Sequence, residues 1–463
     1  MASIQEPARN LEVIAEADVV VAGGGPGGWP AAVAASRQGM STVLIERYGF
    51  LGGMATAGLI GPVLGHTAHS SDTPILGGIP REMCETLHKH GGAPAWNDAI
   101  KDWGVRFEPE IMKVVLDEMV AQANVQFLLH SWVADALVEN DRIRALVIEN
   151  KSGRQAVIGK AFIDATGDAD VAFRAGVPTH SGRPQDGRPM AMGSMFKVGG
   201  VQKLSKKQRE KGADAMSEAR ESGELLIYNP GIETRSSTTR QDYITPNMTR
   251  HAGDPTDAIS LTQAEITVRR EMYDIVEKYR DAVPGYEDAH IAALPTQIGL
   301  RESRQIEGLY TFTGNDVVES QNFDDVIALG SWWIDIHCPL GKVTGGVHVC
   351  RASCPADPLC DMLAEHKGEL PDRLRPDEGE YYDIPFRSLV PRQIDNLLVS
   401  GRCISADNQG MAGTRVMGTC MAIGEAAGTA AALAADRDIA MSEMDISLLQ
   451  AKLEAAGALL GAE

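Results

Sequence analysis

The N-terminal 50 residues contain two short apolar runs separated by glycine and alanine. One run covers residues 18–22 and the other residues 42–46, while residues 27–38 are rich in alanine. Short apolar runs bounded by glycine are typical of buried strands, and alanine favours a helix. The pattern therefore predicts a strand, a glycine turn, a helix and a second strand, which together form a βαβ unit of a parallel sheet.

Three later stretches also have a readable pattern. Residues 128–167 contain turn signals at 139–141 and 151–153, which predict a β-meander whose last strand ends at Ala165-Thr166-Gly167. Residues 396–434 predict a strand, a loop and a small-residue helix that begins near Met417. In the middle of the chain, residues 203–226 predict a solvated polar helix, and residues 261–286 a covering helix that ends at Pro284-Gly285.

Length and charge narrow the class of protein. A chain of 463 residues is too long for one ordinary core, so we expect two domains that can be interleaved in sequence. The net charge is -20 and no long basic tract is present, so nucleic acid is not expected as a partner. The acidic N-terminus and the short apolar stretch 420–435, which carries Glu425, predict a cytoplasmic protein with no membrane segment.

The glycine turn has the spacing of a phosphate-binding loop. Gly23, Gly25 and Gly28 fall in the pattern G-x-G-x-x-G, with Pro26 between the last two. The first glycine allows a tight turn, the second lets a pyrophosphate approach the backbone, and the third lets helix and strand pack closely. Glu46, followed by Arg47, ends the second strand, where a carboxylate accepts hydrogen bonds from an unphosphorylated ribose. The unit thus predicts a dinucleotide, with NAD and FAD both open.

Six motifs distinguish between these cofactors. They are ERYGFLGGMATAG, IDATGDADVAFRAGVP, LPTQIGLRESRQIEGLYTFTGNDV, WWIDIH, YYDIPFRSLVP, and LLVSGRCISA with RVMGTCMAIGEAAG, in this order along the chain. In these motifs the chain resembles a bacterial family of FAD-dependent oxidoreductases with a glutathione-reductase-type FAD domain. The resemblance implies FAD as the cofactor.

The resemblance also implies the fold class and the domain boundaries. It is α/β, with a Rossmann-like FAD-binding domain, made of a parallel sheet plus a β-meander, and an interleaved α+β substrate or cap domain. The FAD-binding domain would be discontinuous, over residues 1–195 and 385–463, with residues 60–110 able to contribute to the substrate side. Residues 196–384 would form the substrate domain.

Residues near the cofactor follow from the same resemblance and from the meander. In the matching motifs, Gly401 is followed by Arg402 where many flavoproteins have aspartate, which puts a carboxylate contact to the ribityl chain in doubt. The N-terminus of the last helix would face the flavin. The predicted cofactor residues beyond the first βαβ unit are Gly52, Gly53, Met54, Thr56, Val133, Ala165, Thr166, Gly167, Asp170, Gly401, Arg402, Met417, Gly418 and Thr419.

On the substrate side, two arginines stand three residues apart. No second phosphate-binding glycine pattern occurs between residues 196 and 385, so we expect no built-in NAD(P)H domain and electrons that come from the substrate. If their segment is helical, Arg301 and Arg304 share a face. One of the two, with Arg301 as the chosen candidate, would hold an acidic substrate or the O2/N3 edge of the flavin; the alternative is a salt bridge with a neighbouring acid such as Glu302 or Glu307.

The preferred proton-transfer residue is His337, because imidazole titrates near neutral pH; a purely structural role is the alternative. On a strand, Asp335 would lie on the same side and orient His337, or face away. Tyr382 and Arg387 are secondary candidates. Cys338, Cys350, Cys354 and Cys360, with His337 and His348, have spacings that fit neither zinc nor iron–sulfur sites, so no metal is expected.

The sequence therefore predicts an FAD-dependent oxidase or dehydrogenase that acts on a small polar metabolite at a C–OH, C–NH or CH–CH position. Hydride would pass to flavin N5, and oxygen or another acceptor would reoxidise the flavin. A hydroxylase that uses NAD(P)H and a non-catalytic electron-relay protein are the alternatives. The partner is a small-molecule substrate, and a homo-oligomer is left open. Trp29, beside Gly28, is expected to pack on the cap or on a partner chain.

Overall fold

The computed structural model describes residues 4–5, 7–184, 186–232, 237–340 and 373–461. Its largest sheet contains five strands that run parallel to one another, in the order β3-β2-β1-β6-β14. They are β1 (Glu12–Ala22), β2 (Thr42–Ile45), β3 (Gln126–Leu128), β6 (Gly153–Asp164) and β14 (Leu397–Val399). The predicted α/β class with a parallel sheet is confirmed, although the first strand begins six residues earlier than the predicted Asp18.

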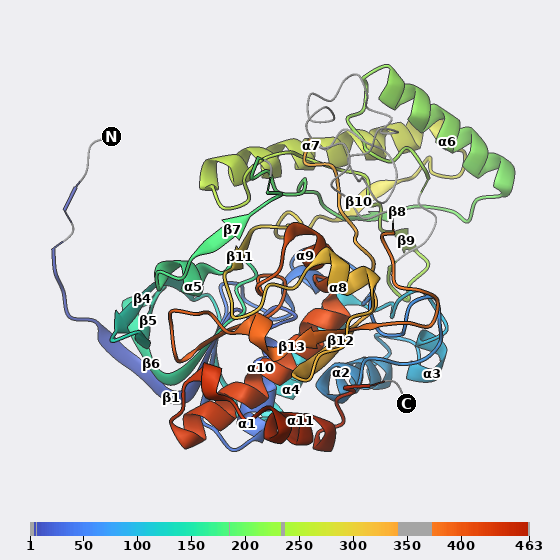
Figure 1. The fold of residues 1–463 in the computed structure, drawn as a ribbon. Coiled ribbons are helices and arrows are strands. Elements are labelled where there is room, and N and C mark those ends of the chain that lie inside the picture. The colour runs from blue at the N-terminus through green and yellow to red at the C-terminus, as the bar shows by residue number, and fades with distance from the viewer. Residues whose placement is uncertain (1–3, 6, 185, 233–236, 341–372, 462–463) are drawn as a thin grey trace.

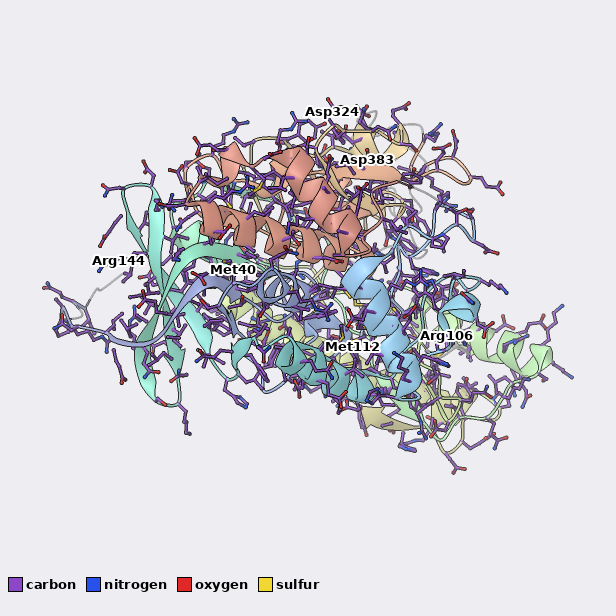
Figure 2. All side chains as sticks on the ribbon, turned by 90° about the horizontal axis from the view of Figure 1, so that it is seen from below. Met40, Arg106, Met112, Arg144, Asp324 and Asp383 are labelled. Atoms are coloured by element: carbon purple, nitrogen blue, oxygen red, sulfur yellow. The ribbon has the colours of Figure 1, made fainter. Side chains whose placement is uncertain are left out.

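The β-meander joins this sheet through β6. Strands β4 (Trp132–Glu139) and β5 (Arg142–Asn150) run antiparallel, and β5 pairs with the first half of β6 while β14 pairs with its last three residues. The turn between β4 and β5 places Asn140 and Asp141 at φ of 51° and 59°, a conformation that Asn and Asp tolerate. Figure 2 shows this ribbon at one end of the molecule, labelled at Arg144.

Helices cover the sheet. They are α1 (Trp29–Arg37), α2 (Gly78–Lys89), α4 (Pro109–Gln122), α10 (Met417–Arg437) and α11 (Ile446–Ala455). α10 packs against α1 so closely that a Cβ on Gly428 would lie 2.0 Å from the carbonyl oxygen of Ala31. The small residues of α10 thus permit a backbone-to-backbone approach, and Figure 1 shows the two helices next to each other.

Residues 192–300 form a separate hydrophobic cluster at the other side of the molecule (Figure 1). It packs the helices α6 (Lys206–Glu221) and α7 (Ala258–Ala282) over a sheet of β8 (Lys197–Gly199), β9 (Tyr243–Ile244) and β10 (His290–Ala293). The two helices predicted for this region are present. Their buried residues, such as Met216, Val268 and Ile275, recur at helical spacing.

Short elements connect the two regions. β7 (Thr179–Ser181) pairs with β11 (Arg304–Ile306), and β12 (Val326–Gly330) pairs with β13 (Tyr382–Pro385), both antiparallel. The remaining helices are α3 (Trp96–Ala99), α5 (Asp170–Arg174), α8 (Gly314–Val318) and α9 (Asn408–Thr414), with 3-10 turns η1 (Gly53–Ala55), η2 (Phe386–Leu389) and η3 (Met441–Glu443).

Two expectations need correction. The segment of Arg301 and Arg304 is not helical: Arg304 begins strand β11 and Arg301 lies in the preceding loop, so the two side chains do not share a helical face. Trp29 is only 2% exposed and belongs to the main core, so it packs inside the FAD-side region and not on a cap or a partner. With Ala55, Met83, Met112 and Met421, which come from other segments of the chain, it lines a small internal cavity.

In the described ranges, no single helix has the length and apolarity to cross a bilayer; only α9 and α10 taken together, with a 91° bend between them, reach that length and composition.

Candidate active site

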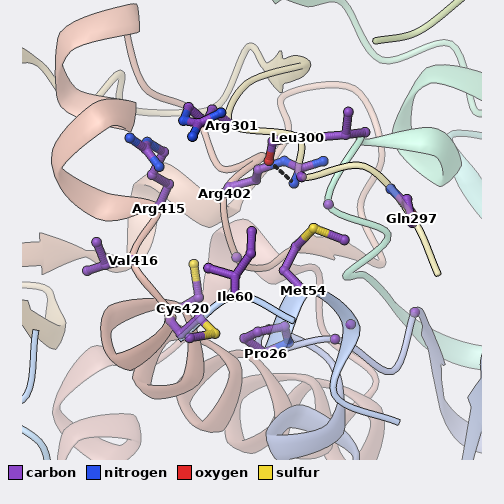
Figure 3. Close-up of a pocket in the computed structure, with 18 of the residues that line it drawn as sticks. Pro26, Met54, Ile60, Gln297, Leu300, Arg301, Arg402, Arg415, Val416 and Cys420 are labelled. Carbon is purple, nitrogen blue, oxygen red and sulfur yellow. Dashed lines mark hydrogen bonds between the residues drawn. The ribbon is translucent and has the colours of Figure 1, made fainter. Parts of the chain in front are cut away.

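One cavity of about 810 Å³ begins at the carboxyl ends of β1, β2, β6 and β14. Carboxyl ends of parallel strands meet at one edge of a sheet, so the loops that follow these strands are neighbours there. From this edge the cavity continues past Ile60 to Gln297, Leu300 and Arg301 (Figure 3), and it also reaches residues 61–64 and 332–337. Its volume is within the range of about 300–1,000 Å³ that ligand pockets occupy.

The glycine turn forms one end of this cavity. Gly23 has φ of +100°, and a Cβ there would lie 2.4 Å from the carbonyl oxygen of Ala165. A Cβ on Gly28 would lie 1.7 Å from the carbonyl oxygen of Gly23, so no side chain fits at either position. At Gly25, by contrast, the nearest atom would be Cα of Gly53, at an ordinary 3.7 Å. Packing within the chain therefore does not require glycine at position 25, whereas a ligand close to the backbone does.

Glu46 lies at the carboxyl end of β2, is only 5% exposed and lines the cavity. Its Oε2 accepts the N–H of Gly24 at 2.7 Å, and its Oε1 accepts the N–H of Tyr48 at 2.8 Å. Burial raises the pKa of this carboxyl, while these two hydrogen bonds lower it. Glu46 thus holds the glycine turn in place, and a carboxylate with these two bonds still has lone pairs for a ribose hydroxyl.

Aromatic side chains flank the same end. Arg47 hydrogen-bonds to Gln297, and its guanidinium lies 4.9 Å from the ring centroid of Tyr48 and 5.1 Å from that of Trp132. Tyr48, Trp132 and the predicted Val133 all line the cavity. The rings of Tyr48 and Trp132 provide flat, apolar surfaces of the kind that an adenine ring packs against.

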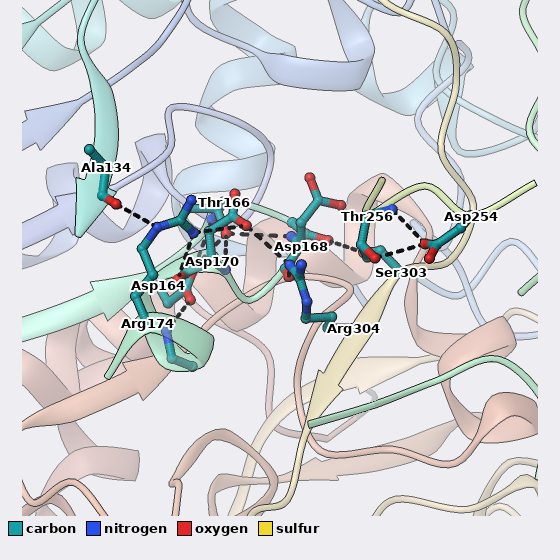
Figure 4. A network of polar contacts seen from close by, with 12 residues as sticks. Ala134, Asp164, Thr166, Asp168, Asp170, Arg174, Asp254, Thr256, Ser303 and Arg304 are labelled. Atoms are coloured by element: carbon teal, nitrogen blue, oxygen red, sulfur yellow. Dashed lines mark hydrogen bonds and ion pairs between the residues drawn. The ribbon is translucent and has the colours of Figure 1, made fainter. Parts of the chain in front are cut away.

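The turn after β6 is held by a hydrogen-bond network (Figure 4). The fully buried Asp164 accepts from Thr166 Oγ1 at 2.7 Å and from the N–H of Ala172 at 2.9 Å, and burial raises its pKa to about 6. The predicted Asp170 lines the cavity but forms an ion pair with Arg304 at 3.1 Å. Arg304 therefore serves this network instead of the substrate side.

Arg402 occupies the position after Gly401 at which many flavoproteins have an aspartate. It forms an ion pair with Asp168. It also donates to the carbonyl oxygen of Leu300 at 2.8 Å (Figure 3). Both Asp168 and Arg402 line the cavity. The carboxylate that position 402 lacks is thus present on the loop after β6, a placement that the sequence pattern did not reveal.

Most of the predicted site residues line this one cavity. They are Gly23, Gly25, Pro26, Glu46, Arg47, Gly53, Met54, Val133, Ala165, Thr166, Gly167, Asp170, Gly401, Arg402 and Met417, with Arg301 and His337 at the far end. These residues come from segments that are up to about 400 positions apart in the chain. The open space at Gly25 and the acid at Glu46 fit a dinucleotide at the sheet end of the cavity.

Six predicted residues do not line it: Gly28, Gly52, Thr56, Tyr382, Gly418 and Thr419. Tyr382 is fully buried, and its hydroxyl donates to the carbonyl oxygen of Trp332 at 3.0 Å, so it supports the cavity wall and cannot touch a substrate. The N–H of Gly418 donates to the carbonyl oxygen of Leu64 at 3.0 Å. The backbone N–H of Gly418, in the first turn of α10, therefore already has a hydrogen-bond partner within the protein, although it was predicted to face the flavin. Arg387, the other secondary candidate, pairs with Asp325 at 2.9 Å and also does not line the cavity.

The far end of the cavity contains the predicted base. His337 is 9% exposed, and its Nε2 lies 3.4 Å from Oδ1 of Asp335, so the pair lies on the same side as expected from their spacing. Arg415 donates to Oδ2 of Asp335 at 3.0 Å. Burial lowers the pKa of His337 to about 3, and the charge of Arg301 acts in the same direction, so the imidazole is neutral at pH 7.

The pKa of Asp335 lies well below its usual range. Burial alone would raise it, but the hydrogen bond from His337 and the charge of Arg415 outweigh that effect. A buried, ionised carboxylate next to a neutral imidazole is the arrangement that orients a general base. Sequence reasoning missed Tyr228, Asn247 and Arg250 at this end because they lie on loops without a recognisable motif, and it assigned no role to Trp333 although that residue belongs to the quoted motif WWIDIH. Arg415 belongs to a quoted motif but was assigned no role.

For the described part of the chain, no group of three or more His, Cys, Asp or Glu side chains is arranged to hold a metal ion. Of the cysteines considered above, Cys338 is buried. Cys350, Cys354, Cys360 and His348 lie outside the described residues.

Comparison with known proteins gives a family and a set of distant structural similarities. Residues 18–453 match the model of the family described as FAD dependent oxidoreductase. A segment of 46 residues is 52% identical to the mitochondrial dihydrolipoyl dehydrogenase of Caenorhabditis elegans, but it covers 10% of this chain and only 9% of that protein.

Among solved structures, the chain is similar to a geranylgeranyl bacteriochlorophyll reductase-like protein of Thermoplasma acidophilum, with 13% identity, a TM-score of 0.39, and coverage of 95% of this chain and 83% of that one. It is also similar to the flavin-dependent brominase Bmp2 (11% identity, TM-score 0.41, coverage 95% and 83%). A third similarity is to the anhydrotetracycline hydroxylase OxyS of Streptomyces rimosus (14% identity, TM-score 0.34, coverage 64% and 54%). Similarities this distant carry no information on substrate or mechanism.

Proposed function

The chain belongs to the family of FAD-dependent oxidoreductases, and from this premise we propose that it oxidises a small polar metabolite and takes the electrons from that substrate. The oxidised position is a C–OH, C–NH or CH–CH bond. One observation carries the proposal: His337, with Asp335, lines the same cavity as the glycine turn that fits the dinucleotide. The finer resemblance to the bacterial family with the six motifs supports the same reading.

The chemistry that FAD supplies when bound is acceptance of a hydride, followed by return of the two electrons to oxygen or another acceptor. The protein must therefore supply a base for the proton that the substrate loses. Because Nε2 of His337 lies beside the ionised Asp335, we assign the ring proton to Nε2. Nδ1 is then the atom that accepts the substrate proton, and Asp335 stabilises the resulting imidazolium.

The walls around His337 keep this proton transfer away from bulk water. Tyr228 packs edge-on against the imidazole with ring centroids 6.3 Å apart, and Trp332 and Trp333 stack on each other at 3.8 Å. All three line the cavity. A buried base with fixed aromatic neighbours is positioned before the substrate arrives, so that little reorganisation is needed during the reaction.

Anaerobic reduction of the purified holoenzyme tests the proposal. Small hydroxy acids, amino acids, alcohols and amines are added one by one, and the visible absorbance of the flavin is followed. We expect at least one such compound to bleach the flavin rapidly, with slow or no bleaching by NADH or NADPH.

The opposite result, rapid bleaching by NADPH and none by any metabolite, would replace this proposal by the NAD(P)H-dependent hydroxylase. Stoichiometric iron in the purified protein, together with an absence of turnover, would favour the electron-relay protein.

A further inference from the structure

Three arginines, each from a different segment of the chain, lie at the far end of the cavity. Arg301 lies in the loop between β10 and β11, Arg415 lies between α9 and α10, and Arg250 lies on the loop after β9. Arg301 and Arg415 line the cavity, where Figure 3 shows them near one another, and Arg250 lies behind Tyr228, with its guanidinium 3.6 Å from the ring centroid. The fold therefore brings three positive charges to the place where the base lies.

Two of these guanidiniums approach each other across Gly193. A Cβ at Gly193 would lie 3.2 Å from Nη1 of Arg250 and 3.2 Å from Nη1 of Arg301. The two Nη1 atoms are thus no farther apart than twice that distance. Like charges this close in a buried site repel each other, so an arrangement of this kind costs stability unless an anion joins it.

The carboxylates at this end do not balance the arginines. Within the described ranges, Asp335 is the only acidic side chain that lines this end of the cavity, and its ion pair is with Arg415. Arg301 donates from Nη1 to the carbonyl oxygen of Ala191 at 3.0 Å, and Arg250 donates to Asn247 and to the carbonyl oxygen of Thr249. These partners are neutral. Two guanidinium charges are therefore left without a carboxylate partner among the described residues.

Arg250 also has donors that are not used. It is only 6% exposed, and in the described structure its buried Nε and Nη2 have no hydrogen-bond partner. Unpaired buried donors are rare in proteins because the desolvation of each one destabilises the folded state. Burial lowers the pKa of Arg250 to about 10, and burial together with the charges of Arg250 and Arg415 moves the pKa of Arg301 well below its usual range.

We propose that Arg301, supported by Arg250, binds the carboxylate of the substrate, and that the substrates of this enzyme are small organic acids. The proposal rests on the proposed function, because it names the class of metabolite that is oxidised. The planar guanidinium matches a planar carboxylate through two parallel hydrogen bonds, and Arg301 lines the cavity. Phosphate shares this oxyanion chemistry, and the experiment below separates the two.

An anionic substrate would also activate the base. Arg301 and, more weakly, Arg250 lower the pKa of His337 through their charges, while Asp335 raises it. A bound carboxylate offsets the charges of these guanidiniums, so the pKa of His337 is lowered less. The imidazole therefore becomes a stronger base when the acid is bound. Substrate binding and proton abstraction are thereby coupled in one cavity.

Binding to the oxidised holoenzyme tests the proposal without requiring turnover. The probes are matched pairs of an acid and its primary amide, namely lactate with lactamide, malonate with malonamide and succinate with succinamide, together with inorganic phosphate. Perturbation of the flavin absorbance and quenching of the fluorescence of Trp332 and Trp333 report occupancy. We expect at least one acid to bind at least tenfold more tightly than its amide and than phosphate, and its Kd to rise with added salt.

Substitutions then locate the site. Arg301→Gln and Arg250→Gln should each raise the Kd of that acid tenfold or more, with a smaller effect for Arg301→Lys. Arg269→Gln, on the exposed face of α7 where Arg269 pairs with Glu265, is the matched control and should leave the Kd unchanged. FAD content and the thermal midpoint verify that each variant is folded; if the Gln variants do not fold, the comparison of acid with amide in the unchanged enzyme still decides.

Three results would overturn the inference. The first is equal binding of acids and amides, the second is binding of phosphate but of no carboxylate, and the third is a loss of FAD affinity in the arginine variants with unchanged binding of the acid. Its failure is distinguishable from that of the proposed function. If acids and amides reduce the flavin equally well, the proposed oxidoreductase function stands and the carboxylate site is excluded. If acids bind but never reduce the flavin, the carboxylate site stands and the proposed oxidation is excluded.

Discussion

At the scale of single residues, the chemistry depends on a histidine whose environment was set by segments far away in the chain. His337 is neutral because it is buried and because Arg301 lies near it, while Asp335 is ionised because His337 and Arg415 bond to it. The imidazole is thus held neutral and the carboxylate ionised, which is the form of each group that base catalysis requires. This division of roles within the pair leads to a direct test.

Replacing the base should remove most of the activity. His337→Gln keeps a polar side chain of similar size but cannot accept a proton, so we expect kcat/KM to fall by about 10²- to 10⁴-fold. FAD content should stay the same, because His337 lies at the end of the cavity remote from the glycine turn. His290→Gln, on exposed β10, is the control. Activity retained in His337→Gln would assign the histidine a structural role.

The glycine turn allows packing to be separated from ligand binding. Because a Cβ at position 25 meets only Gly53 at 3.7 Å, Gly25→Ala should fold with an unchanged thermal midpoint in the absence of FAD. Its added methyl would occupy the space where the cofactor approaches, so we expect the Kd for FAD to rise about tenfold or more, which is about 1.4 kcal/mol. Titration of the apoprotein with FAD measures this. Unchanged affinity would mean that the cofactor does not approach the turn at Gly25.

At the scale of elements, the contact between α1 and α10 positions the site. α1 begins directly after the glycine turn, and α10 begins beside the cavity at Met417. Gly424 and Gly428 on α10 face the backbone of Gly27 and Ala31, at distances that leave no room for a side chain. The helices can approach this closely only because these residues are small. Their separation therefore sets the distance between the turn and the flavin side of the cavity.

Enlarging one of these glycines should force the helices apart. In Gly428→Ala the new Cβ would lie 2.0 Å from the carbonyl oxygen of Ala31, so backbone must move. Although alanine has the higher helix propensity, we expect a net destabilisation of about 1–3 kcal/mol, as for other overpacked cores. Chemical denaturation measures the change. A stabilised variant would show that α10 can shift without cost and that the contact does not define the site.

At the scale of the whole molecule, buried acids make stability dependent on pH. Burial raises the pKa of Glu425 on α10 to about 8, and it raises those of Glu271 and Glu302 to about 8 and about 7. At pH values between the ordinary pKa of a glutamate and these raised pKa values, the folded state still binds protons that the unfolded chain has released. Stability from these groups is thus complete at low pH and is lost as the pH rises through their folded pKa values.

Glu425 provides the cleanest test, since it is only 2% exposed and its Oε2 accepts the N–H of Ile79 at 3.0 Å. The thermal midpoint should fall between pH 5.5 and pH 8.5. Glu425→Gln keeps the shape of the side chain but carries no titratable group, so we expect its thermal midpoint to fall less steeply. The corresponding loss of unfolding free energy over this pH range should be smaller than in the unchanged protein, by on the order of a few kcal/mol at most. The exposed Glu454→Gln on α11 is the control. An equally steep fall in both variants would exclude Glu425 as a source of the pH dependence.

The sequence by itself determined the parts of the molecule that depend on local pattern. The βαβ unit, the phosphate-binding turn and the acid at Glu46 are encoded within about 30 consecutive residues, because strand period, glycine spacing and helix propensity all act over short distances. The β-meander and α10 could be predicted for the same reason. Most of the residues expected near the cofactor, from the glycine turn or from the family resemblance, do line one cavity.

Only the tertiary structure decided which side chains meet at the far end of the cavity. Arg250, Arg301, Arg415 and Asp335 lie on four loops, and no spacing in the sequence links them. The same holds for Asp168, which supplies a carboxylate beside Arg402, and for Tyr382, which the fold buries behind Trp332. Contacts between distant loops depend on how sheet edge and covering region pack, and this is information that local periodicity does not contain.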